Sequence, residues 1–92
     1  MRRQDMAHPL VVHCKREAYD IYVGRPSVWG NPFRMTDESQ REQIILRYRA
    51  WFLAQPGLVE RARRELRGRR LGCWCAPKAC HGDVLAEIAN GL

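Results

Sequence analysis

Three of the four cysteines in this 92-residue chain fall within residues 71–85, together with a histidine. Tetrahedral zinc takes thiolate and imidazole ligands, which makes a candidate zinc site of Cys73, Cys75, Cys80 and His81. The C-x-C-x4-C-H spacing differs from the C-x2-C knuckles of common zinc fingers, and free cysteines are also common as small buried apolar residues. A nucleophilic cysteine is a third interpretation, although no recognisable nucleophile motif surrounds any of the thiols. The segment therefore indicates a functional site, and all three interpretations of its cysteines remain open.

Three further residues bear on this segment. Asp83 stands at the predicted start of a helix, where an acid caps the chain and interacts well with the helix dipole. The same carboxylate is also a candidate general base, so both roles remain open. In an extended strand Trp74 would point away from the face that carries Cys73 and Cys75, and Trp74 is a candidate substrate contact. Cys14 is a candidate fourth thiolate from the first predicted strand.

A second candidate binding segment spans residues 24–33 and is punctuated by glycine and proline, which indicates a loop. An arginine can donate two hydrogen bonds to a phosphate, an amide can hydrogen-bond to the edge of a pyrimidine, and flat rings can stack on a base. The alternative is a loop pinned by prolines, with its two aromatic rings buried in the core. The candidate binding residues of this loop are Arg25, Ser27, Trp29, Gly30, Asn31 and Phe33.

The charge of the chain favours a polyanionic partner. Its formal net charge is +6, and fourteen of its sixteen basic residues are arginines, which bind phosphate bidentately and stack on bases. Six arginines lie between residues 61 and 70 on a predicted helix and its exit. They could follow a nucleic-acid backbone, although such a run is often only a solvated face. The candidate backbone contacts are Arg61, Arg64, Arg67 and Arg69.

The whole chain, residues 1–92, is expected to form one domain. Apolar patterning predicts strands over 9–15, 19–23 and 69–75 and helices over 38–54, 58–66 and 82–90. The first helix carries an apolar stripe from Ile44 to Phe52 that is expected to belong to the core, and it should end at Pro56-Gly57, while Gly68 should end the second helix. Asp37 and Gln40 resemble a capping box before the first helix. The order β-β-α-α-β-α predicts an α/β or α+β fold, a small single-layer sheet with helices packed on it. The three-residue link 16–18 is short enough for a hairpin between the first two strands, and the direction of the third strand is left open.

The sequence gives no sign of a membrane protein. No apolar run approaches the roughly 20 residues of a membrane span, and residues 1–10 lack the apolar core of a secretory signal. We therefore expect a cytoplasmic protein whose thiols are reduced, in which metal binding or catalysis is a better explanation of four cysteines than disulfides.

The loop 24–33 and the segment 71–85, with its C-W-C and C-H-G-D-V-L stretches, resemble the small bacterial and phage family called domain of unknown function family 4326. The resemblance extends from Val11 to Ala89. It implies a nucleotide or DNA-modification context, because some members look like DNA glycosylases that act on 5-hydroxymethyluracil. Cys14 departs from the family pattern, in which a non-thiol residue is expected, and this weakens its candidacy as a ligand.

The leading functional hypothesis is a DNA N-glycosylase that flips a modified pyrimidine out of the duplex and hydrolyses its N-glycosidic bond. Trp29 and Phe33 would stack the base and Asn31 would read it. Asp83 would stabilise the sugar cation or activate water, and His81 would hydrogen-bond the departing base. DNA is the expected partner. No cofactor is required for this chemistry, with a structural zinc as a possible addition.

Two alternatives remain at this point. One is a non-enzymatic, zinc-stabilised module that binds DNA or RNA through its arginines, which chelation should unfold. The other is an N-glycosidase that acts on a free nucleotide metabolite and needs no salt-sensitive affinity for DNA. A Schiff-base mechanism is disfavoured, because only Lys15 and Lys78 could form the imine and neither has an obvious means of lowering its pKa.

Overall fold

The computed structural model describes residues 8–76 and 78–91. The described chain is a mixed α/β fold with the predicted order of elements. A single 3-10 turn, Glu38–Gln40, precedes the first helix. The elements are β1 (Val11–His13), β2 (Ile21–Tyr22), α1 (Arg41–Leu53), α2 (Pro56–Glu65), β3 (Leu71–Cys73) and α3 (His81–Ala89).

The three short strands form a parallel sheet in the order β1-β3-β2. Leu71 of β3 pairs with Val11 on one side and with Ile21 on the other. The predicted hairpin between the first two strands is therefore wrong, because β3 lies between them. β3 is buried along its whole length, so the central position of the sheet, with a strand on each side, suits it.

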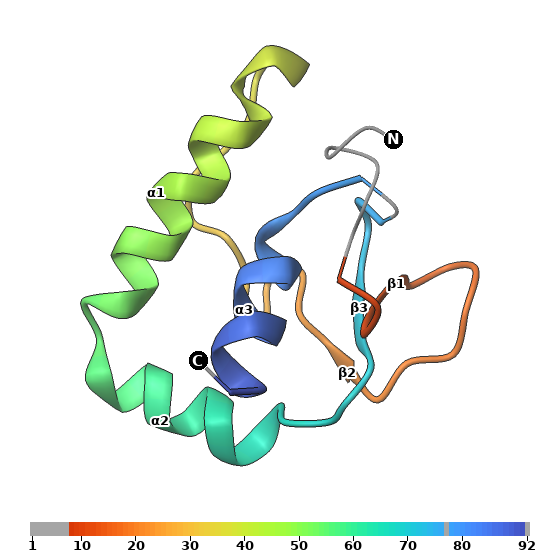
Figure 1. Ribbon diagram of the computed structural model, residues 1–92. Coiled ribbons are helices and arrows are strands. Elements are labelled where there is room, and N and C mark those ends of the chain that lie inside the picture. The colour runs from red at the N-terminus through yellow and green to blue at the C-terminus, as the bar shows by residue number, and fades with distance from the viewer. Residues whose placement is uncertain (1–7, 77, 92) are drawn as a thin grey trace.

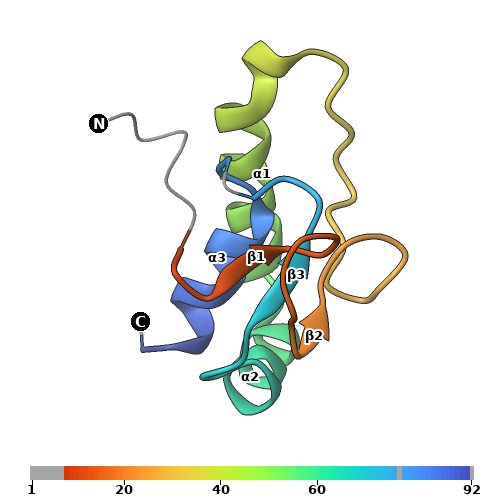
Figure 2. The ribbon, with the colours of Figure 1, turned by 90° about the vertical axis from the view of Figure 1, so that its right-hand side faces the viewer.

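The helices lie on one side of the sheet. α3 contacts β1 and β3, while α1 and α2 pack against α3, as Figures 1 and 2 show. On the other side, the ring of Tyr19 covers β3: a Cβ added to Gly72 would lie 2.6 Å from Cγ of Tyr19. Glycine is thus needed at the centre of β3, because the segment between β1 and β2 passes directly over it.

Local signals in the sequence explain the helix boundaries. The Asp37 carboxylate accepts from the Ser39 amide at 2.9 Å, and the Gln40 side chain accepts from the Asp37 amide, which confirms the predicted capping box. Pro56 ends the first helical segment, as predicted, and also opens α2, where its missing N–H has no bond to lose. Gly68 follows the end of α2 and has a φ of +72°, a conformation that suits glycine.

The core lies between the sheet and the three helices. The rings of Tyr48 and Phe52 stack 5.7 Å apart on the inner face of α1, in the apolar stripe predicted for this helix. The Tyr48 hydroxyl is also buried, and it donates to the Trp29 carbonyl at 2.8 Å. This bond satisfies the hydroxyl and ties the loop 24–33 to α1. The largest fully buried aliphatic side chains are those of Val23, Leu66, Leu71, Val84 and Leu85.

Candidate active site

A pocket of about 450 Å³ opens where β2 and β3 end and α3 begins. Ligands of parallel sheets commonly bind at this carboxyl edge, beside the first turn of a helix. The loop 24–33 and the segment 71–85, which are far apart in the chain, meet here. The lining residues are Tyr22, Gly24, Arg25, Asn31, Phe33, Met35, Arg41, Ile44, Ile45, Cys73, Trp74, Cys75, Ala79, Cys80 and His81.

One wall of the pocket is a chain of hydrogen bonds between the two segments. The indole Nε1 of Trp74 donates to the Tyr22 hydroxyl at 2.8 Å, and this hydroxyl donates to the Arg25 carbonyl at 3.1 Å. The Arg25 guanidinium in turn donates to the Asn31 carbonyl at 3.2 Å. The peptide bond between Arg25 and Pro26 is cis. These contacts fix the loop against the end of β2.

The Asn31 side chain is oriented within this loop. Its Oδ1 accepts from the Phe33 amide at 2.8 Å, and its Nδ2 amino group remains as the donor that the pocket can use. A pyrimidine carries carbonyl oxygens, which are acceptors, and an amino donor is their complement. Phe33 lies beside the same pocket and meets the ring of Trp51 edge-on at 6.4 Å.

His81 stands in the first turn of α3 and lines the pocket. Its Nε2 lies 2.7 Å from the carbonyl oxygen of Val23. Because a carbonyl oxygen can only accept, Nε2 must carry the proton. Burial lowers the pKa of His81, so the ring is neutral at pH 7 and Nδ1 has a free lone pair. The imidazole is therefore equipped to accept a proton, whereas its one donor is already engaged.

Three thiols form the opposite wall. The Sγ atoms of Cys73 and Cys80 are 3.1 Å apart, and both side chains are buried. Cys75 is half-buried and lines the pocket together with Arg41. Hydrogen bonding to Cys80 and to Arg41 outweighs burial and lowers the pKa of Cys75 to about 6, while hydrogen bonding to Cys73 and Cys75, together with burial, raises the pKa of Cys80. Cys75 is therefore the more acidic of these two thiols.

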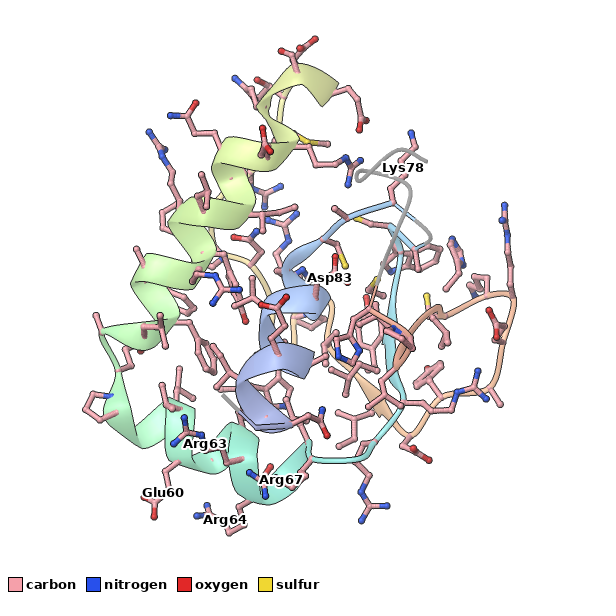
Figure 3. The ribbon with its side chains drawn as sticks, in the orientation of Figure 1. Glu60, Arg63, Arg64, Arg67, Lys78 and Asp83 are labelled. Carbon is pink, nitrogen blue, oxygen red and sulfur yellow. The ribbon has the colours of Figure 1, made fainter. Side chains whose placement is uncertain are left out.

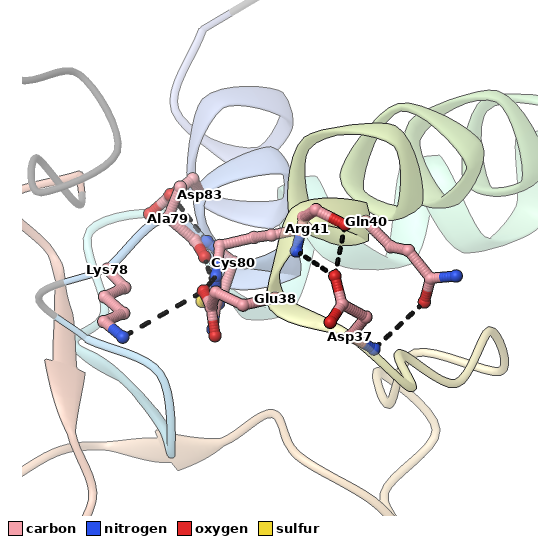
Figure 4. A network of polar contacts seen from close by, with 9 residues as sticks. Asp37, Glu38, Gln40, Arg41, Lys78, Ala79, Cys80 and Asp83 are labelled. Atoms are coloured by element: carbon pink, nitrogen blue, oxygen red, sulfur yellow. Dashed lines mark hydrogen bonds and ion pairs between the residues drawn. The ribbon is translucent and has the colours of Figure 1, made fainter.

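Arg41 is held in place from two sides. It donates to the Ala79 carbonyl at 2.9 Å and forms an ion pair with Glu38, within a network that links the start of α1 to the loop before α3 (Figure 4). Lys78 approaches the same Glu38 carboxylate at 4.0 Å. The network places one guanidinium beside the thiols with little freedom to move.

The arrangement of these residues does not match the expected zinc site. Tetrahedral zinc with Zn–S bonds of about 2.3 Å holds its sulfur ligands about 3.8 Å apart. The Cys73 and Cys80 sulfurs, at 3.1 Å, are closer than that. Within residues 8–76 and 78–91, no group of three or more histidine, cysteine or acidic side chains is placed to hold a metal ion, and Cys14 joins none.

Asp83 has a structural role. Its Oδ2 accepts from the Cys80 amide at 3.0 Å, and its Oδ1 accepts from the His8 amide at 2.9 Å. Cys80 completes a capping box, because its sulfur accepts from the Gly82 amide at 3.3 Å. Burial raises the pKa of Asp83. The carboxylate caps α3 and does not line the pocket, so the structure does not bring it to the site as a general base.

Three residues of the loop 24–33 that were predicted to contact substrate have structural roles in the loop instead. Trp29 is only 4% exposed and packs on Phe52, so the prediction that it stacks a base is wrong: the ring belongs to the core. The Ser27 hydroxyl donates to the Gly24 carbonyl at 2.6 Å. A Cβ on Gly30 would lie 2.9 Å from Cγ of Arg25, so this position allows a close approach. Neither Ser27 nor Gly30 lines the pocket.

The predicted arginine face lies elsewhere. Arg67 donates to the Ala89 carbonyl at 2.8 Å, at the end of α3 opposite to the pocket. Figure 3 shows Arg64 and Arg67 on and just beyond α2, far from Lys78 and Asp83. Arg61 pairs with Glu65 at 2.9 Å and lies over the Trp29 ring, and Arg64 and Arg69 are exposed. None of these four arginines lines the pocket.

Other cations lie close to the pocket in space or in the sequence. Arg25 is exposed and lines the pocket, and the exposed Arg34 stands in the sequence between the lining residues Phe33 and Met35. The Lys15 ammonium lies 5.6 Å from the ring centre of Trp74, which is 56% exposed. A positively charged rim of this kind favours an anionic substrate or a polyanion whose reacting part enters the pocket.

Sequence reasoning missed several lining residues. Ile44 and Ile45 belong to the stripe of α1 that was assigned only to the core, and Arg41 precedes that stripe. Tyr22 was assigned only to a strand. No local pattern marks such residues, because they reach the site through the packing of α1 and the end of β2. The remaining missed residues are Gly24, Met35 and Ala79.

Comparisons with known proteins give one consistent match. The sequence model of the family Domain of unknown function (DUF4326) matches residues 12–91. An uncharacterized 12.4 kDa protein of the nrdA-td intergenic region of Enterobacteria phage T4 is 39% identical over 85 residues, which cover 89% of this chain and 78% of the phage protein. No solved structure matches the chain. No helix in the described part of the chain is long and apolar enough to span a membrane.

Proposed function

From the premise that the chain belongs to the DUF4326 family, we propose that it is a DNA N-glycosylase that removes a modified pyrimidine, with 5-hydroxymethyluracil as the expected base. One observation carries the proposal. A pocket of about 450 Å³ combines an aromatic ring, an amide donor and a neutral imidazole behind a basic rim. This volume lies within the range of about 300–1,000 Å³ that is typical of small-molecule sites.

Base recognition would use the loop side of the pocket. Phe33 would replace the stacking that the base loses when it leaves the duplex, beside the apolar wall of Ile44 and Ile45. The Nδ2 group of Asn31 would donate to a carbonyl oxygen of the base. Arg25 and Arg34 would contact the phosphates that flank the flipped nucleotide.

Bond cleavage would use His81 as the proton acceptor. As the bond between C1′ and N1 breaks, its electron pair leaves with the base and positive charge develops on the sugar. Nδ1 of His81 would accept a proton from the water that adds to C1′, and the departing base would be protonated by solvent. This revises the earlier role of His81 as a donor to the base, since Nε2–H is already bonded to Val23.

The proposal is tested with duplexes that carry 5-hydroxymethyluracil, uracil or thymine, followed by alkaline cleavage at abasic sites. His81→Gln should lower the rate of base release by about 10²- to 10⁴-fold, the usual contribution of a general base, while DNA affinity stays unchanged. Asp83→Asn serves as the comparison. A His81→Gln variant that retains full activity would remove His81 from the mechanism.

The assay also separates the two alternatives. Salt-sensitive DNA binding without base release would favour a binding module, and a chelator that unfolds the chain would then point to a structural metal. Base release from free nucleotides, without affinity for DNA, would favour a metabolite N-glycosidase. Either result would contradict the DNA glycosylase.

A further inference from the structure

Trp74 lines the pocket, yet 56% of its surface is exposed, and neither base recognition nor bond cleavage uses its ring. An exposed tryptophan beside a pocket marks a surface that binds a partner. We propose that Trp74 is a stacking platform for an unpaired DNA base, so that the protein binds single-stranded DNA more tightly than a duplex. This inference rests on the proposed function, because it takes the pocket to receive a base of the same strand.

The indole of Trp74 is held in position by its neighbours. Its Nε1 donates to the Tyr22 hydroxyl at 2.8 Å, and the ring of His13 meets it edge-on with centroids 5.8 Å apart. His13 in turn accepts from the Lys15 amide through Nδ1 at 3.1 Å, which ties the following segment to the same place. A ring that is fixed in this way loses little conformational freedom when a base stacks on it.

A base can take the position that Lys15 occupies over the ring. The ammonium lies 5.6 Å from the ring centre, and the side chain is exposed. An exposed cation–π contact contributes only about two- to fivefold to an equilibrium constant. A base stacked on an aromatic side chain contributes about 5- to 150-fold. A base would therefore displace the ammonium, and the flexible side chain would then reach the phosphate of the same nucleotide.

The segment between β1 and β2 supplies the positive charge of this surface. Lys15 and its neighbour Arg16 are exposed and form no ion pair within the described part of the chain. Both acids of the segment are engaged by Arg70: Glu17 pairs with its guanidinium at 3.0 Å, and Asp20 accepts from its amide at 2.8 Å. The charge left over is positive and complements the phosphates of a strand.

Only an unpaired base can use this platform. Inside a duplex both faces of a base are covered by its neighbours, so a base must leave the stack before it can stack on a side chain. Trp74 borders the same pocket as Phe33, so a single strand would place one base in the pocket and a neighbouring base on Trp74. In single-stranded DNA neither base has to be extracted from a duplex, which predicts the tighter binding.

The test measures fluorescence anisotropy of the full chain with three labelled, unmodified ligands: a thymidine oligonucleotide, an abasic strand of the same length, and the thymine–adenine duplex. Trp74→Ala should weaken binding of the thymidine strand about 5- to 150-fold and leave binding of the abasic strand unchanged. Trp74→Phe loses the bond to Tyr22 but keeps a ring, so it should retain part of the affinity. Leu46→Ala is the control, because Leu46 is 61% exposed on α1 and does not line the pocket.

Three results would overturn the inference: a wild type that binds the duplex at least as tightly as the thymidine strand, an unchanged affinity in Trp74→Ala, or an equal loss for the thymidine and abasic strands. A circular-dichroism spectrum that matches the wild type shows that each variant is folded. Since the ligands contain no modified base, stacking on Trp74 can fail while base excision succeeds, and base excision can fail while stacking is observed.

Discussion

Nε2 of His81 lies 2.7 Å from the carbonyl oxygen of Val23, and this contact joins the first turn of α3 to the segment that follows β2. The ring of His81 also meets Tyr48 edge-on, with centroids 5.1 Å apart. The sheet edge, the helix N-terminus and α1 therefore all hold one imidazole. Its tautomer is fixed by the fold before any substrate binds.

The pH dependence of stability should reflect this burial. The pKa of His81 in the folded chain lies below its value of about 6.5 in the unfolded chain. Above pH 6.5 both states are neutral and stability is full. As the pH falls below 6.5 the unfolded chain binds a proton first, so the free energy of unfolding falls by at most about 1.4 kcal/mol per pH unit from this residue.

Urea unfolding of the wild type and His81→Gln at pH 7.5 and 5.5 measures this effect. The wild type should lose more stability than the variant over this range, so the difference between them should narrow at the lower pH. His8 and His13 are present in both proteins and cancel in the comparison. If the free energies of unfolding of the two proteins changed equally with pH, the protonation of His81 would not be coupled to folding.

The reactivity of Cys75 should depend on Arg41. Because hydrogen bonds from Cys80 and Arg41 lower the pKa of Cys75 to about 6, its alkylation by iodoacetamide should reach half of its maximal rate near pH 6. Arg41→Gln should move this midpoint upward. The rate is read at each cysteine by peptide mass spectrometry, and a midpoint unchanged by Arg41→Gln would contradict the role given to the guanidinium.

Gly24→Ala should distort the wall of the pocket. A Cβ at this position would overlap the Tyr22 hydroxyl and lie 2.6 Å from the adjoining ring carbon, so the ring that accepts from Trp74 would have to shift. We expect a loss of about 1–3 kcal/mol in the free energy of unfolding. Gly57→Ala is the matched control, because nothing lies within 4 Å of its added Cβ. Equal stability of the two variants would refute the close contact.

DNA binding should depend on the pocket rim and not on α2. Arg34→Gln should weaken binding and reduce the slope of log K against log[salt] by about 0.9, the value for one lost phosphate contact. Arg64→Gln should change neither quantity, because Arg64 lies on the far side of the molecule (Figure 3). Fluorescence anisotropy over a range of salt measures both. The reverse pattern would move the DNA interface to α2.

Much of the fold could be predicted from local patterns. Apolar spacing and the Asp37–Gln40 capping box located α1, and Gly68 marked the exit from the second helical segment. The strand order could not be predicted, because the pairing of Leu71 with both Val11 and Ile21 joins distant segments. The strands are also shorter than predicted, so seven residues (14–20), and not three, separate β1 from β2 and can pass over the central strand.

The candidate site, like the fold, could be predicted from the sequence only in part. Residues whose chemistry is unusual for their position, such as Asn31, His81 and the three cysteines of residues 71–85, could be named from the sequence, and the structure brings them to one pocket. The role of Trp29 could not be predicted from the sequence, since a tryptophan in a loop serves equally well as a core residue or as a stacking surface. Packing against Phe52 decides that it is core.

Excision of a modified pyrimidine by the pocket is measured through the products of a reaction with a duplex that contains 5-hydroxymethyluracil. We expect free 5-hydroxymethyluracil, detected by mass spectrometry, together with DNA that alkali cleaves at the same position, and no release from the matched thymine duplex. An intact duplex after prolonged incubation with the folded, DNA-binding protein would contradict it.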